Sequence, residues 1–104
     1  MDVLAIQQQL RDFAVARDWP RFHTPKNLVM AMSVEMAELL EHFQWLTPEE
    51  AQALPQDAAK LDAVGQEMAD VMMYMLRLAD VLGVNLADAI ARKMLLNAQK
   101  YPAP

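Results

Sequence analysis

Two pairs of carboxylates at helical spacing are the residues of this sequence with the clearest potential for chemistry. Glu35 and Glu38 form the first pair, and Glu67 and Asp70 form the second. Residues three positions apart lie on the same face of an α-helix. Carboxylate oxygens are the hard ligands that Mg²⁺ and Mn²⁺ prefer. The pattern points to a divalent metal site, although acidic pairs on solvated helix faces are common.

The position of each pair relative to its apolar neighbours strengthens this interpretation. Each segment carries a row of apolar residues, its apolar ridge, along one helix face. At about 100° per residue, the angle around the helix axis between Glu35 and its ridge nearly equals that between Glu67 and its ridge, whereas Glu41 points outward. Each pair therefore lies at one edge of a buried stripe. The ridge residues are Leu28, Met32, Met36, Leu39 and Phe43 in the first segment, and Leu61, Val64, Met68, Val71, Met75, Leu78 and Leu82 in the second.

The two pairs also stand at matching heights. Glu35 lies about 16 Å before the expected end of its helix, and Glu67 lies about 15 Å after the start of the next long helix. If these helices are antiparallel neighbours, the pairs meet. Four carboxylates at a partly buried interface repel one another unless a cation is bound. Because Mg²⁺ usually keeps waters and adds phosphate oxygens, we expect a phosphate-handling site, with a purely structural acidic surface as the alternative.

The remaining pattern predicts an all-α, four-helix bundle-like domain over residues 1–104 in which two long antiparallel helices carry the acidic motifs. Thr24 before Pro25, and Thr47 with Glu50 three residues later, are helix-start signals. Gly83 is placed to end a helix and Asn85 to begin the next. The expected helices are 2–18, 25–46, one or two turns within 48–54, 57–83 and 86–100, with Val3, Ile6, Leu10, Phe13, Ala14, Leu86, Ile90, Met94 and Leu95 facing inward.

Composition excludes several classes of function. The formal net charge of −5 argues against nucleic acid and anionic membranes as partners. A phosphorylated ligand remains compatible, because bound cations reverse the local charge. The absence of cysteine rules out disulfides and thiolate metal sites. With no basic-then-apolar leader after Met1 and no apolar run of roughly 20 residues, we expect a soluble, cytoplasmic protein.

The sequence does not contain the motifs of several other metal-binding and catalytic sites. A di-iron bundle needs Glu-x-x-His on its helices, whereas His42 follows Glu38 by four positions and no second such histidine exists. There is no calcium-binding EF-hand loop and no glycine-rich phosphate loop. No Ser-His-Asp arrangement can be derived from the sequence.

The ordered motifs resemble those of the MazG-like all-α nucleoside triphosphate pyrophosphohydrolases, and most closely the dCTP pyrophosphatase branch. The resemblance extends over nearly the whole chain. The matching segments are Arg11-Asp12-Phe13 through Phe22-His23, Pro25-Lys26-Asn27-Leu28, Glu35-Met36-Ala37-Glu38-Leu39, Phe43-Gln44-Trp45, Glu67-Met68-Ala69-Asp70-Val71 through Tyr74, and Lys93-Met94 through Asn97 to Lys100-Tyr101-Pro102.

The resemblance implies cleavage between the α and β phosphates of a nucleoside triphosphate, giving a monophosphate and pyrophosphate. It implies Mg²⁺, with Mn²⁺ as a substitute, held by Glu35, Glu38, Glu67 and Asp70. One of these carboxylates, with Glu38 as our first choice, could instead accept the proton of the attacking water, and the sequence does not separate a ligand from a base. The expected substrate is dCTP or a modified cytosine nucleotide.

Further residues are candidates for substrate binding. Lys93, Asn97 and Lys100 share one helix face and suit phosphate oxygens, unless they are ordinary polar surface. The resemblance implies that Trp19, His23 and Trp45 surround the base, and aromatic faces stack on bases. Tyr101 is a candidate that either joins the phosphate contacts or stacks. Tyr74 is a further stacking candidate that is equally suited to the core, and Asn27 is a candidate hydrogen-bonding partner of the base edge or sugar.

Two rival functions remain at this point. One is a noncatalytic helical module that binds nucleotide or a partner helix. The other is a phosphoribosyl-ATP pyrophosphohydrolase-like enzyme. The aromatic loop at 19–23 argues against this second rival, because it favours recognition of a base.

The 57–83 helix is apolar around much of its circumference, at Met72, Met73, Leu76 and Val81. Together with the resemblance, this predicts a homodimer or a homotetramer with active-site parts shared between subunits.

Overall fold

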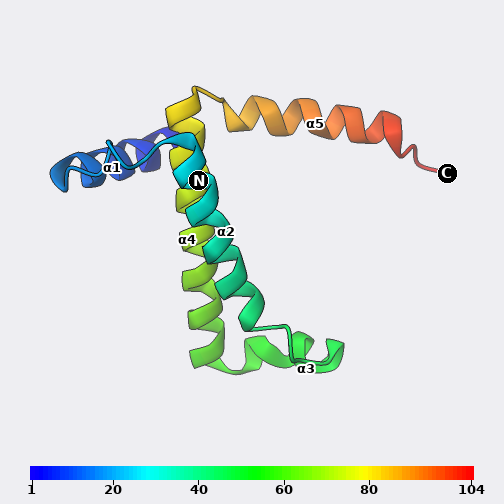
Figure 1. The fold of residues 1–104 in the computed structure, drawn as a ribbon. Helices are drawn as coiled ribbons and strands as arrows, with labels where there is room; N and C mark the ends of the chain where they lie inside the picture. The colour runs from blue at the N-terminus through cyan, green and yellow to red at the C-terminus, as the bar shows by residue number, and fades with distance from the viewer.

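A computed structural model describes residues 1–104 as an all-helical chain without strands, which confirms the expected fold class (Figure 1). No helix in it combines the length and the apolar character needed to cross a membrane. The elements are α1 (Val3–Ala16), α2 (Pro25–Glu41), α3 (Pro48–Ala53), the 3₁₀ turn η1 (Leu54–Gln56), α4 (Ala58–Leu82) and α5 (Leu86–Lys100).

The helices begin where capping side chains satisfy their first amide groups. Thr24 accepts a hydrogen bond from the amide of Asn27 at 3.3 Å and so begins α2. Thr47 and Glu50 form the expected reciprocal capping box of α3. Asn85 caps α5 in the same way. These starts are confirmed because they depend only on local sequence.

Gly83 ends α4 and Asp18 ends α1, and both residues adopt a left-handed backbone conformation. Gly83 has a φ of 72°, and the next amide, that of Val84, donates to the Ala79 carbonyl at 2.9 Å. Asp18 has a φ of 58°, a conformation that asparagine and aspartate tolerate better than most residues. The Trp19 amide then donates to a carbonyl of α1 at 3.0 Å. Because Asp18 turns the chain, α1 ends at residue 16, before the expected boundary at residue 18.

The second helix also ends earlier than expected, at Glu41 instead of near Leu46. Tight turns replace its last residues: the Phe43 amide donates to Leu40 and the Leu46 amide to Phe43, both at 2.9 Å. Such short-range bonds commonly tighten a helix end. They lead the chain into the extended conformation of Thr47 that α3 requires.

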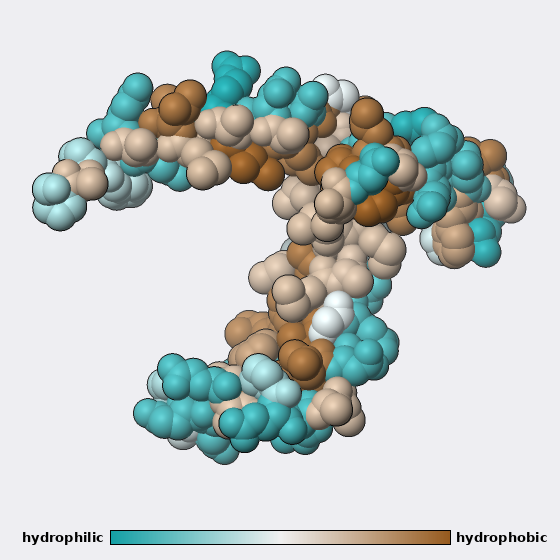
Figure 2. Space-filling model, turned by 180° about the vertical axis from the view of Figure 1, so that it is seen from behind, coloured by the Kyte–Doolittle hydropathy of each residue, from teal (hydrophilic) through white to brown (hydrophobic).

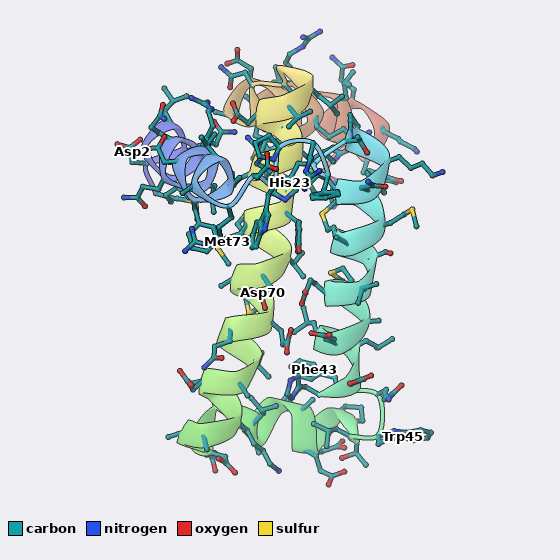
Figure 3. All side chains as sticks on the ribbon, turned by 60° about the vertical axis from the view of Figure 1, so that its left-hand side comes forward. Asp2, His23, Phe43, Trp45, Asp70 and Met73 are labelled. Atoms are coloured by element: carbon teal, nitrogen blue, oxygen red, sulfur yellow. The ribbon has the colours of Figure 1, made fainter.

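An antiparallel hairpin of α2 and α4 forms the stem of the molecule, and α1 crosses the upper part of α4 (Figures 1 and 3). Gln7 of α1 donates to the Leu76 carbonyl of α4 at 3.0 Å, and this bond is buried. The hairpin brings the two acidic motifs to one interface, as their positions in the sequence predict. The buried apolar residues are Ala14, Leu28, Leu54, Val64, Leu76 and Ala79.

The helix α5 extends away from the stem, so a single chain does not close its own bundle (Figure 1). The expected burial of Ile90, Met94 and Leu95 within one chain is wrong, since they are 59%, 67% and 68% exposed. The turn after Gly83 directs α5 away from the stem, and residues 87–100 are all exposed. In Figure 2, apolar surface lines the hollow between this arm and the α3 end of the stem. Other expected core residues that are exposed are Phe13, Met36, Leu61, Met68, Met75 and Leu82.

Candidate active site

Three carboxylates converge between α2 and α4. Glu35 and Glu38 come from α2 and Glu67 from α4, and one oxygen of each lies within 4.8 Å of the others. All three side chains are partly buried. This spacing allows one divalent ion to contact all three residues at once.

The cluster carries an uncompensated negative charge. Oε2 of Glu35 and Oε2 of Glu67 are buried without a hydrogen-bond partner. Burial raises the pKa of Glu35 from 4.5 to about 7, and the adjacent Glu38 carboxyl and the charges of Asp70 and Glu67 add to this effect. Burial, Glu38 and Asp70 likewise raise the pKa of Glu67, against a smaller opposite effect of His42. An all-oxygen donor set with two unpartnered buried atoms fits a hard divalent cation such as Mg²⁺ or Mn²⁺.

Asp70 extends the cluster toward a cavity. It stands one helical turn after Glu67 on α4, outside the three residues that approach one another most closely. Asp70 and Glu35 both line a cavity of about 380 Å³ that lies beside the cluster. Because Glu35 belongs to both the cluster and the cavity lining, the carboxylates and the cavity form one continuous site.

Aromatic side chains form much of the cavity wall. The rings of Phe13 and Trp19 meet edge to face with centroids 5.4 Å apart, and the ring of His23 lies 5.9 Å from that of Trp19. Of the residues expected to bind the base, the structure places Trp19, His23 and Tyr74 at this cavity. The full lining is Leu10, Phe13, Ala14, Trp19, His23, Glu35, Asp70, Met73, Tyr74 and Arg77.

Other candidates lie away from this cavity in a single chain. The Asn27 side chain donates to the Phe22 carbonyl at 3.0 Å and so stabilises the loop between α1 and α2. Trp45 is 87% exposed and points away from the α2–α4 hairpin (Figure 3). Lys93, Asn97, Lys100 and Tyr101 lie on or directly after the projecting α5, all exposed, with the Lys100 ammonium 5.4 Å from the Tyr101 ring centroid.

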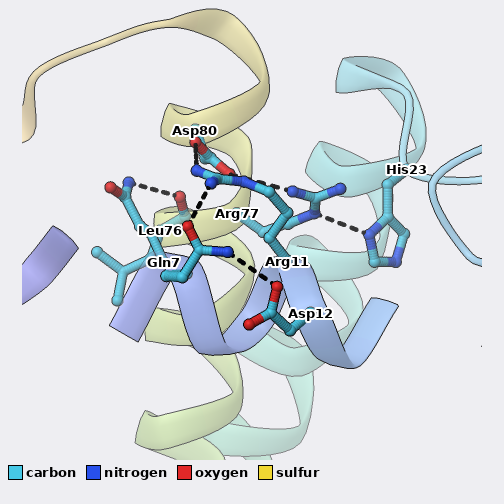
Figure 4. A network of polar contacts seen from close by, with 8 residues as sticks. Gln7, Arg11, Asp12, His23, Leu76, Arg77 and Asp80 are labelled. Carbon is cyan, nitrogen blue, oxygen red and sulfur yellow. Dashed lines mark hydrogen bonds and ion pairs between the residues drawn. The ribbon is translucent and has the colours of Figure 1, made fainter. Parts of the chain in front are cut away.

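Arg77 was not among the residues expected at the site, yet it lines the cavity and is only 8% exposed. Its Nε donates to Nδ1 of His23 at 3.1 Å, and its Nη1 bonds to Asp80 at 3.2 Å (Figure 4). Arg11 of α1 binds the same Asp80 carboxylate through two bonds of 3.0 and 2.7 Å. A signal was present: an arginine three positions after Tyr74 and seven after Asp70 shares their helix face, beside an apolar ridge.

Comparison with known proteins places this arrangement in a family. A sequence model of the MazG-like family matches residues 30–104. Human dCTP pyrophosphatase 1 is 39% identical over 92 residues, and mouse dCTP pyrophosphatase 1 is 38% identical over 91 residues. Each match covers 88% of this chain and 54% of the relative, so the chain spans about half the length of these relatives.

A solved structure gives the same result for the fold. The crystal structure of a pyrophosphatase from Archaeoglobus fulgidus superposes with a TM-score of 0.82 at 44% sequence identity, covering 92% of this chain and 88% of that one. The matched family model covers both acidic motifs and α5. The chain is a member of the MazG-like family.

Proposed function

We propose that this protein is a nucleoside triphosphate pyrophosphohydrolase that releases a nucleoside monophosphate and pyrophosphate. The observation that carries the proposal is the junction of the Glu35, Glu38 and Glu67 cluster with an aromatic-walled cavity. Such a site can hold the phosphates and the base of one nucleotide at adjoining positions. The names of the human and mouse relatives and of the archaeal structure support this activity.

Glu35, Glu38, Glu67 and Asp70 are the proposed Mg²⁺ ligands, with Mn²⁺ as a substitute. Bound Mg²⁺ would neutralise triphosphate charge and lower the pKa of a coordinated water. The interface of α2 and α4 holds the carboxylates in place, so little reorganisation is needed when substrate binds. As an alternative to a ligand role, Glu38 is our candidate for the carboxylate that accepts a proton from the attacking water.

The cavity is the proposed base site. Stacking on aromatic side chains contributes roughly 1–3 kcal/mol per base, and Trp19, His23 and Tyr74 offer such surfaces here. We propose dCTP or a modified cytosine nucleotide as the preferred substrate, by analogy with the dCTP pyrophosphatases. The reaction would remove surplus or non-standard nucleotides in the cytoplasm, with neither nucleic acid nor membrane as a partner.

A second copy of the chain would complete the site. The exposed apolar residues of α5 need a partner surface, and an apolar hollow adjoins them in Figure 2. We propose a homodimer or homotetramer in which Trp45 and the α5 residues Lys93, Asn97 and Lys100, with Tyr101 after them, reach the cavity of a neighbouring subunit. Lysine and asparagine there would contact phosphate oxygens.

A nucleotide panel tests the activity. The protein is incubated with each (d)NTP and Mg²⁺ in ¹⁸O-water, with and without chelator, and products are identified by mass spectrometry. We expect monophosphate and pyrophosphate, with no turnover after chelation. Orthophosphate as the first product, or turnover that ignores the chelator, would contradict the proposal. Nucleotide binding without hydrolysis would favour a noncatalytic module, and turnover of phosphoribosyl-ATP alone would favour that related enzyme.

Two variants of α2 connect this activity to the cluster. Glu38→Gln should abolish turnover while circular dichroism remains helical, because the variant loses the anionic oxygen that would bind the metal or accept the proton. Glu41→Gln changes an exposed carboxylate on the same helix and should retain activity. Equal activity of the two variants would contradict a role of the cluster in catalysis.

A further inference from the structure

Arg77 is a buried arginine whose side chain contacts a cavity histidine instead of the acidic cluster. Its guanidinium lies between Asp80 and His23 (Figure 4), to which it donates at 3.2 and 3.1 Å. Its side chain is 10% exposed and that of Asp80 is 17% exposed. The two contacts leave the guanidinium little freedom to rotate.

Asp80 supplies a fixed countercharge for this arginine. Arg11 donates to Asp80 through Nε and Nη2 at 3.0 and 2.7 Å. Hydrogen bonding from Arg11 lowers the pKa of Asp80, with the charges of Arg11 and Arg77 acting in the same direction. Asp80 therefore stays ionised at neutral pH and holds Arg77 in the orientation that faces His23.

The contact with His23 determines where the imidazole carries its proton. An arginine side chain has donors only and stays protonated in proteins. Nδ1 of His23 must therefore act as an acceptor in the 3.1 Å bond from Arg77. A neutral imidazole with an unprotonated Nδ1 carries its proton on Nε2. Burial and the Arg77 charge both lower the pKa of His23, so the neutral form is favoured as well.

The loop before α2 fixes the position of the His23 ring. The His23 amide donates to the carbonyls of Trp19 and Pro20, both at 3.1 Å, and the ring stands next to the Trp19 indole in the cavity wall. Because Arg77 occupies Nδ1, the N–H at Nε2 is the ring donor left for a ligand. A bound molecule thus meets a neutral donor of defined direction.

We propose that Arg77 is a positioning residue for substrate selection, which holds His23 as the Nε2–H tautomer so that His23 donates a hydrogen bond to the nucleobase. The class recognised is a base with a carbonyl oxygen or an unprotonated ring nitrogen at that edge, as cytosine has at O2 and N3. The inference rests on the proposed function, because that function puts a base in the cavity.

The tautomer is measurable without substrate. The chain has two histidines, so ¹⁵N NMR of histidine-labelled protein gives two imidazole systems, and His23→Gln assigns them. We expect the His23 Nδ1 signal at the position of an unprotonated nitrogen and the Nε2 signal at that of a protonated one at neutral pH. An Nδ1–H tautomer or an imidazolium in the wild-type spectrum would overturn the proposal.

Variants at position 77 connect the tautomer with substrate selection. Arg77→Met keeps an unbranched chain but removes the donor, so we expect a mixture of His23 tautomers and a KM for dCTP raised roughly 3- to 10-fold with kcat little changed, the size of one lost hydrogen bond. Arg77→Lys retains a donor and should restore part of both effects. Arg92→Met, at an exposed arginine of α5, is the matched control and should change neither.

The outcomes separate this proposal from the proposed function. If Arg77→Met raises KM while the His23 signals stay unchanged, Arg77 acts on the ligand directly and the proposal fails. If Arg77→Met does not fold, the His23 tautomer in the wild-type spectrum and the KM of Arg77→Lys test the proposal. Absence of turnover in wild-type protein with the expected tautomer would refute the proposed function, whereas a wrong tautomer in an active enzyme refutes the role of Arg77 alone.

Discussion

Glu35 and Glu67 belong to different helices, yet each has a carboxylate oxygen buried at their shared interface with no hydrogen-bond donor. An unpartnered buried polar atom costs free energy, and like charges at such short range add to that cost. The hairpin of α2 and α4 tolerates this strain because burial of Leu28, Val64 and Leu76 elsewhere along it offsets the cost. The acidic interface thus lowers the stability of the metal-free protein, and a bound divalent cation would raise it.

Neutralising Glu35 should stabilise the metal-free protein. With chelator at pH 8, we expect Glu35→Gln to raise Tm by on the order of 5 °C, because one of the repelling charges is removed. Mg²⁺ or Mn²⁺ should raise the Tm of wild-type protein but not that of the variant. Differential scanning calorimetry measures both effects, and Glu41→Gln is the control. A lower Tm for metal-free Glu35→Gln would contradict this account of the cluster.

The raised pKa of Glu35 also predicts how stability depends on pH. Between pH 4.5 and about 7 the folded protein binds more protons at Glu35 than the unfolded chain does. The free energy of unfolding of metal-free protein should therefore fall as pH rises through this range. Urea titrations in chelator at several pH values measure it. In Glu35→Gln this part of the decline should disappear, and an identical pH profile in both proteins would contradict the assignment.

Asp80 should matter more for stability than Arg11, although the two residues form one ion pair. Asp80→Asn leaves the nearly buried Arg77 without its countercharge and should cost about 2–3 kcal/mol of unfolding free energy. Arg11→Met leaves Asp80 paired with Arg77, and since Arg11 is partly exposed the loss should be smaller. Urea unfolding with a common m-value gives the comparison. Equal losses would show that Arg77 needs no countercharge.

The sequence predicted the local features of this fold well. Thr24, Thr47, Gly83 and Asn85 act within one helical turn, so their roles can be inferred from neighbours alone. The meeting of the acidic motifs was also predictable, because helix geometry fixes their phase and height. The contact from Arg77 to His23 joins residues 54 positions apart and depends on how α1 and its loop cross α4. The way α1 crosses α4 produces no periodic pattern in the sequence, so this contact could not be predicted.

The direction of α5 and the exposure of Trp45 were unpredictable for a related reason. An apolar stripe such as that of Ile90 and Met94 shows that a surface will be covered, but not by which chain. The sequence therefore suggested burial, and the single chain shows exposure. The same reason applies to the candidate residues carried by α5. It does not apply to the acidic residues, because both of their helices belong to the stem.

The proposed base site predicts that Trp19→Ala and Trp45→Ala affect the KM differently. Trp19→Ala should raise KM for dCTP roughly 5- to 150-fold, since stacking contributes about 1–3 kcal/mol per base. Trp45 lies away from the cavity of its own chain, so Trp45→Ala should raise KM only in the assembled protein. Steady-state kinetics across a range of protein concentrations test this. A Trp19→Ala variant with unchanged KM and base preference would rule out stacking at that residue.

The apolar face of α5 should drive assembly. The double variant Ile90→Glu with Met94→Glu places charge on that face, and we expect it to shift the mass in light scattering to the 11.8 kDa of one chain. Its activity should fall because Trp45 and the α5 residues no longer reach a neighbouring cavity. Gln99→Glu adds charge at another exposed position of α5 and is the control. A wild-type protein that is monomeric at every concentration would refute the proposed assembly.

The origin of the side chains at this site has a consequence for how the family can diversify. All four carboxylates come from α2 and α4, whereas Leu10, Phe13, Trp19 and His23 come from α1 and the loop that follows it. If the proposed function holds, changes in that N-terminal segment would alter nucleotide preference and leave the proposed metal ligands unchanged. Under that proposal, exchanging residues 1–24 between relatives should transfer substrate preference without transferring the acidic cluster.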